Sequence, residues 1–227
     1  MFLGFEDPIY IISSGLILLL AVIGLIKIFW ILRHKSFMEN IHFTVLGIDQ
    51  DVMGKGLKEL LLSIKTPFSF EVAIHNLGNK LNYYLVVPKK RAKNLIKLDG
   101  VSEVEDYHIF HSGGSHMGAY FKGGHAWPSL DINKIDFSKV NDVGEGVVVQ
   151  MVFDKAPLKD RFRKDKAMAV NFRVLASAPS DYQANEIVDG IKKSFSEYGS
   201  VDVNSPMFTH VVNFREFVPK EQMVWYS

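Results

Sequence analysis

The chain has 227 residues, with 26 Lys and Arg against 25 Asp and Glu, a net charge of +1, 48% hydrophobic residues and no cysteine. This composition is that of a folded protein, and the lack of cysteine excludes disulfides, thiol catalysis and cysteine-based metal centres. The near-zero net charge does not indicate a globally basic nucleic-acid binder.

The first element is a long apolar run from Ile9 to Leu32, with Glu6 and Asp7 before it and the basic stretch 33–35 after it. A helix rises about 1.5 Å per residue, so the run is long enough to cross a hydrocarbon core of roughly 30 Å. Since positive charge marks the cytoplasmic side, we predict a single-pass anchor in the inner (cytoplasmic) membrane, with the N-terminus outside and the following domains in the cytoplasm. A buried core helix is the alternative, although such a helix usually has one polar face.

A linker over residues 34–40 separates the N-terminal segment and anchor (1–33) from a first α+β module over 41–112. Period-2 alternation from Phe68 to His75 is typical of a strand with one buried face. The expected elements are a strand at 41–48, a helix at 52–65, strands at 68–74 and 81–87, a helix at 89–98 and a strand at 101–110. This βαββαβ order is that of the ferredoxin-like motif.

A glycine-rich connection over 113–130 leads to a second α+β module over 131–218 and a tail over 219–227. The expected elements are a short strand at 119–122, a helix at 131–140, strands at 147–153 and 168–177, a helix at 181–198 and a strand at 207–217. Counting 119–122, the second half repeats the βαββαβ order and indicates a duplication. The predicted fold class is therefore α+β, with an N-terminal transmembrane helix followed by two ferredoxin-like modules.

The sequence predicts no catalytic, cofactor-binding or metal-binding residue, and so no enzyme. The only hint of a phosphate loop, at 54–56, lacks the earlier glycine and the Ser or Thr of the Walker pattern. Four histidines, with Asp106 as a possible carboxylate partner, are the strongest metal candidates: His108, His111, His116 and His125. Their spacing matches no metal motif, and a metal-dependent membrane-bound enzyme built on this loop is the alternative function.

Basic residues gather in two places. The first group is a possible lipid or nucleic-acid contact, with a merely solvated face as the ordinary interpretation. Its members are Lys89, Lys90, Arg91, Lys93 and Lys97. The second group lies in 155–166 and is partly offset by Asp160 and Asp165. A lipid- or DNA-binding module is therefore a further alternative.

A series of short motifs spans the chain: Val87–Lys90, Asp106-Tyr107, Gly144–Gln150, Phe172–Ala178, Ser194-Phe195 and Asn213–Phe217. Over most of residues 5–217 the series resembles the membrane-anchored N-terminal region of bacterial conjugative-transfer (type IV secretion) ATPases. In that family a P-loop motor domain follows, and since no Walker motif occurs here, the resemblance brings no catalytic residue onto this chain. It implies a docking or scaffold protein, accessory to type IV secretion or conjugative DNA transfer, with a P-loop secretion ATPase as partner and DNA as a further possible contact.

Overall fold

The computed structural model describes residues 13–25, 43–50, 56–75, 80–107, 113–123, 135–157, 160 and 167–226. The chain divides into two compact units, Met1–His42 and Phe43–Ser227. In the first unit, residues 13–25 are helical, and their large apolar side chains, Leu16 and Leu25 among them, are exposed.

The predicted transmembrane anchor is wrong. Within the described ranges, no helix has both the length and the apolar character needed to cross a membrane. The described helical residues, 13–25, are fewer than the roughly 20 residues that a span requires. The rest of the apolar run, 9–12 and 26–32, lies outside the described residues. The predicted inner-membrane localisation depended on this anchor and is corrected with it.

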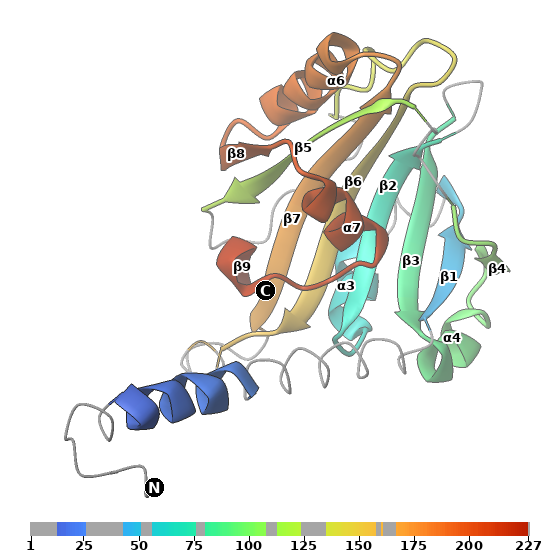
Figure 1. Ribbon diagram of the computed structural model, residues 1–227. Helices are drawn as coiled ribbons and strands as arrows, with labels where there is room; N and C mark the ends of the chain where they lie inside the picture. The colour runs from blue at the N-terminus through green and yellow to red at the C-terminus, as the bar shows by residue number, and fades with distance from the viewer. Residues whose placement is uncertain are drawn as a thin grey trace, which may run out of the picture. The chain divides into compact units, whose positions relative to one another are not determined.

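The second unit is built on one antiparallel sheet of nine strands, in the order β4-β1-β3-β2-β6-β7-β5-β8, with β9 also pairing with β7 (Figure 1). The strands are β1 Phe43–Ile48, β2 Phe68–Ile74, β3 Asn82–Pro88, β4 Val101–Val104, β5 Ser115–Lys122, β6 Gly146–Lys155, β7 Ala167–Ala178, β8 Gly199–Val203 and β9 Gln222–Tyr226. The helices are α3 Leu57–Ser63, α4 Lys89–Leu95, α6 Asp181–Ser194 and α7 Pro206–Asn213, with a 3-10 turn η2 at Pro219–Glu221.

The predicted fold class is also wrong, because the halves do not form two modules that follow an anchor. The first half does contain the expected order β1, α3, β2, β3, α4 and β4. However, β2 pairs with β6 along its whole length, from Phe68 opposite Phe153 to Ile74 opposite Val147. Every residue of β2 is buried, so neither its faces nor its backbone edge is left to solvent. Alternation along a strand identifies its faces, and it does not identify the strand paired at its edge.

The strand predicted over Met207–Phe217 is a helix, α7. The Ser205 hydroxyl caps it by accepting the Met207 N–H at 3.2 Å, and Pro206 occupies the first turn, where its missing N–H costs nothing. The strand that follows α6 is instead β8, and β9 lies in the segment expected to be a tail. Strand β5 contains the short strand expected at 119–122 and begins earlier, at Ser115, within the stretch expected to be a connection. The helix expected over 131–140 falls partly outside the described residues, and 135–140 are not helical.

The two faces of the sheet are covered differently. One face carries the large apolar cluster, to which α3, α4 and α6 contribute Leu61, Ala92 and Ile187 among others. The other face carries a smaller apolar cluster that includes Phe208 and Val212 of α7. Figure 1 shows α7 in front of the central strands and α3 behind them. The second unit is therefore layered as helices, sheet, and a single helix.

Candidate functional site

Three polar residues form a continuous row across the central strands on the face that α7 covers. Glu71 of β2 lies opposite Gln150 of β6, which lies opposite Arg173 of β7. Their side chains are at most 1% exposed. Burying a charge is costly unless the charge is paired and hydrogen-bonded. These residues, here called the polar row, therefore require partners from whatever covers them.

The partners come from residues 204–221, here called the covering segment, which runs through α7 and η2 across the sheet (Figure 1). Gln150 Nε2 donates to the Val212 carbonyl at 2.9 Å and to Glu71 Oε1 at 3.0 Å. Arg173 donates from Nε to Glu221 Oε2 at 2.6 Å and from Nη1 to the Glu216 carbonyl at 2.8 Å. Gln150 and Arg173 of the polar row thus hold the covering segment at three points, Val212, Glu216 and Glu221.

Asn171, two residues before Arg173 on β7, adds a further attachment. Its amide oxygen accepts the Val218 N–H at 2.5 Å and an Arg173 Nη2 proton at 2.8 Å. Its amide nitrogen donates to the Val218 carbonyl at 3.0 Å. Burial lowers the pKa of the Arg173 guanidinium, while Glu221 and Glu216 oppose that shift.

Glu71 is the most heavily bonded member of the row. Its carboxylate accepts from Arg215 Nε at 2.9 Å and Nη2 at 3.3 Å, from Tyr107 Oη at 2.6 Å and from Ser69 Oγ at 2.7 Å, besides Gln150. A carboxylate has about four lone-pair sites, so its acceptor capacity is filled. Glu71 is therefore a structural acceptor within the fold.

Arg215 joins the covering segment to two carboxylates at once. Besides Glu71 it contacts Asp106, from Nη1 to Oδ2 at 2.8 Å and from Nη2 to Oδ1 at 2.6 Å. Burial alone lowers the pKa of Arg215. The negative charge of Glu71 and the hydrogen bonds from Arg215 to Asp106 outweigh this effect and hold the pKa of Arg215 above its ordinary value. An arginine side chain is protonated at neutral pH in any case, and these two carboxylates favour its charged form further.

The backbone of Arg215 is left-handed, with φ 54°, the single non-glycine residue with positive φ in the described part of the chain. It ends α7, since its N–H donates to the Val212 carbonyl and the Glu216 N–H donates to the Val211 carbonyl. This is the Schellman arrangement, in which glycine is the usual residue at the left-handed position. A strained arginine persists here because its side chain has two carboxylate partners.

An aromatic group closes one end of the row. The Tyr107 ring stacks on Tyr84 at 4.4 Å and on His75 at 5.0 Å between centroids, and the Arg215 guanidinium lies 5.8 Å from its centroid. Burial and the nearby Glu71 carboxylate raise the pKa of Tyr107 well above its usual value. Tyr107 therefore remains a neutral phenol that donates to Glu71.

Helix α7 sits very close to the sheet. A Cβ added to Gly118 of β5 would lie 2.4 Å from Cε1 of Phe208, so only glycine admits this ring. The outward side of α7 and the residue after it carry two exposed apolar side chains, Met207, which is 69% exposed, and Phe214, which is 58% exposed. The His210 ring lies between these positions and contacts the Phe214 ring at 4.3 Å. We call Met207, His210 and Phe214 the outer stripe of α7.

Of the predicted contact residues, Lys89, Lys90, Lys93 and Lys97 are exposed on or just after α4. Arg91 has a structural role instead, because its guanidinium donates to the carbonyls of Lys65 and Pro67. Most of the second basic group, in 155–166, lies outside the described residues.

The histidine loop is not assembled into a site in the part of the chain that the structure describes. His108, His111 and His125 lie outside it, His116 is on β5, and Asp106 is bound to Arg215. No group of three or more potential metal ligands occurs among the described side chains.

Sequence reasoning missed the polar row and the role of Arg215. The available signal was a charged or amide residue inside each of three strongly apolar strands. The motifs that carry the family resemblance do include Asp106, Tyr107, Gln150, Arg173 and Arg215. Far apart in the chain, they meet at this one site.

Comparison with known proteins gives no counterpart: no family model matches the chain, and no curated protein or solved structure is significantly similar to it.

Proposed function

We propose that this chain is a non-catalytic protein-docking module, accessory to a type IV secretion or conjugative DNA-transfer system, and that its partner is a P-loop secretion ATPase. One observation carries the proposal: α7 is fixed to the sheet by its inner face and by the polar row, yet its outer face presents Met207 and Phe214 to solvent. A rigidly mounted helix with an apolar outer stripe is suited to bind another protein.

The residue types of the outer stripe support docking. Aromatic residues and methionine are enriched at protein–protein interfaces, where a few buried side chains carry most of the binding energy. Phe214 directly precedes Arg215, so the ion pairs of Arg215 also fix the backbone of Phe214 before any partner binds. Such preorganisation lowers the entropy lost on binding.

The bonding of the polar row supports a structural role over a catalytic one. Glu71 is saturated by donors from Ser69, Tyr107, Gln150 and Arg215, and Arg173 is bonded through all three of its nitrogens. A general acid or base needs a free position from which it reaches a substrate proton. These groups instead hold α7 in place.

The choice of partner class comes from the family resemblance. Its motifs at Asp106-Tyr107, Phe172–Ala178 and Asn213–Phe217 supply residues that fix the covering segment, so the resemblance concerns the same part of the fold as the proposed docking face.

The test measures binding of the full-length chain to the purified P-loop ATPase encoded nearest to its gene, by biolayer interferometry. We expect the double substitution M207S/F214S to weaken binding roughly 30-fold or more, as for interface residues worth about 2 kcal/mol. The control V143S/Y182S removes two side chains that are 74% and 70% exposed elsewhere, and should bind like the unmodified chain. No binding by the unmodified chain, or equal loss in the control, contradicts the proposal.

A further inference from the structure

A second surface, distant in the sheet from the outer stripe, is formed by lysines at one end of the central strands. Lys89 directly follows β3, Lys155 ends β6, and these strands flank β2 on either side. Lys65 lies just before β2. Neighbouring strands are about 4.8 Å apart, so three adjacent strand ends place these lysines within roughly 10 Å of one another at the backbone.

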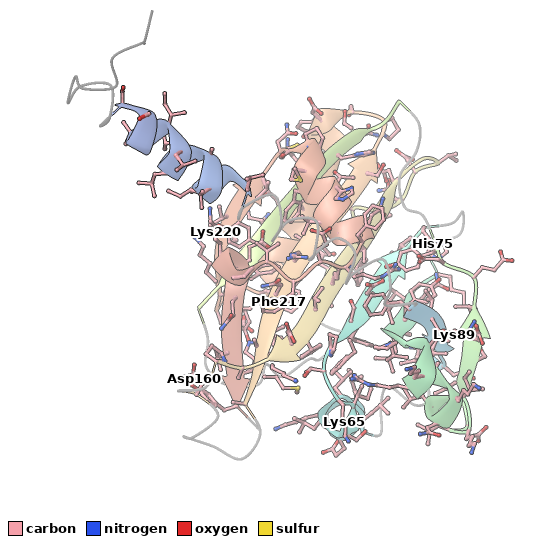
Figure 2. The ribbon with its side chains drawn as sticks, turned by 60° about the horizontal axis from the view of Figure 1, so that its bottom comes forward. Lys65, His75, Lys89, Asp160, Phe217 and Lys220 are labelled. Atoms are coloured by element: carbon pink, nitrogen blue, oxygen red, sulfur yellow. The ribbon has the colours of Figure 1, made fainter. Side chains whose placement is uncertain are left out.

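Helix α4 extends this group. Lys93 lies one turn after Lys89 on the same side of α4, and Lys90 is adjacent. Arg91 ties α4 to the start of β2, because it donates to the carbonyls of Lys65 and Pro67. The arginine thus fixes the lysines relative to one another. Figure 2, which turns this end toward the viewer, labels Lys65 and Lys89 there.

These lysines, unlike Lys139 and Lys192, have no carboxylate partner among the side chains that the structure describes. Lys192 is paired with both Asp189 and Asp202, and Lys139 with Glu186. Within the described residues, no ion pair involves any of the five lysines at this end, all of which are exposed: Lys65, Lys89, Lys90, Lys93 and Lys155. The neighbouring Asp154 accepts the backbone N–H of Lys155 at 2.7 Å. In the part of the chain that the structure describes, this end is therefore a group of lysines without carboxylate partners, although the whole chain carries only +1.

We propose that this lysine end binds the phosphate backbone of duplex DNA without sequence preference. Its chemistry is phosphate-directed, since it offers five exposed ammonium groups, and lysine contacts to phosphate oxygens carry no sequence information. The lysines lie on strand ends and one short helix, which suits contacts along a sugar–phosphate backbone. This inference does not depend on the proposed docking partner, because it uses different elements.

The test is fluorescence anisotropy of the full chain with a labelled duplex of roughly 20 base pairs. If four lysines contact phosphates, the logarithmic salt slope is about −3.6, and raising salt from about 50 to about 200 mM weakens binding roughly a hundredfold. Two unrelated duplex sequences should bind equally.

The variant K89Q/K155Q should weaken binding roughly tenfold and make the salt slope shallower by about 2. The control K193Q/K220Q changes the net charge equally at exposed lysines on α6 and η2, and should leave both values unchanged. Four results would overturn the proposal: no binding at low salt, equal weakening in the control, a clear sequence preference, or stronger binding to phosphatidylserine vesicles than to the duplex.

Discussion

The two faces of the sheet follow different physical rules, and two neighbouring residues of β7 show this most clearly. Phe172 and Arg173 are both fully buried and point to opposite faces. Phe172 packs among aromatic rings, with centroid distances of 4.4 Å to Phe121 and 4.7 Å to Phe195. Arg173 instead makes directed bonds to Glu221, Asn171 and the Glu216 carbonyl.

The two faces therefore have different roles in the fold. Apolar packing is non-directional and tolerates changes of shape that conserve volume. Buried ion pairs add little net stability, but removing one partner is strongly unfavourable, so they favour one arrangement over others. The apolar face therefore holds the unit together, whereas the polar row determines where the covering segment lies.

The largest effect should come from Glu71→Leu, which leaves Arg215, Gln150 and Tyr107 without their shared acceptor. We expect a loss of about 3 kcal/mol in the free energy of unfolding, measured by urea denaturation. The double variant Glu71→Leu/Arg215→Met removes both charges and should be more stable than Glu71→Leu by about 1 kcal/mol or more. Additive destabilisation by the two substitutions would contradict the polar-row account.

Gly118→Ala tests the close approach of α7 from the apolar side. The new Cβ must displace the Phe208 ring, and overpacking of this kind destabilises by about 2 kcal/mol. Combining it with Phe208→Leu should give a smaller loss than the sum of the two single losses. A Gly118→Ala protein as stable as the unmodified chain would show that α7 is not seated as described.

Arg215→Gly and Arg215→Ala separate the backbone of that residue from its side chain. Both lose the contacts with Glu71 and Asp106, but glycine adopts φ 54° without the penalty that alanine meets. We expect Arg215→Gly to be the more stable of the two by about 1 kcal/mol in denaturation measurements. Equal stabilities would mean that the variant backbone leaves the left-handed region.

The smallest effect concerns pH. The pKa of Tyr107 is raised in the folded state, so its contribution to stability is present below its ordinary value of about 10 and is lost as the pH rises beyond it. The unfolding free energy should therefore fall more steeply above about pH 10 in the unmodified chain than in Tyr107→Phe. Parallel pH profiles would show that the Tyr107 hydroxyl does not contribute to stability in this way.

Much of the strand content could be predicted because period-2 alternation is a local property. The strands near 68–74, 81–87, 147–153 and 168–177 were expected, and each is present with small changes at its ends. The pairing of β2 with β6 was not predicted, since an antiparallel contact between the two halves of the chain leaves no local pattern in the sequence. Helix α7 was missed because valine and phenylalanine in 207–217 favour strands, and the Ser205-Pro206 start signal was given no weight.

The site could not be predicted for a related reason. Alternation placed Glu71 on the strand face opposite to its apolar neighbours, which we expected to meet solvent. Glu71 does lie on that face of the sheet. That face is buried because the covering segment returns across it from residues 204–221, far along the chain. Whether a polar strand residue is solvated or paired depends on this tertiary return, which the local sequence around Glu71 does not encode.

Hydrogen–deuterium exchange of the full chain with Arg215→Ala measures whether the polar row fixes α7. If the polar row holds α7 and its outer stripe in place, the amides of 207–213 should exchange at least tenfold faster than in the unmodified chain, while those of β6 and β7 keep their protection. Unchanged exchange in 207–213, or equal acceleration throughout the sheet, would contradict the claim that this row fixes the covering segment.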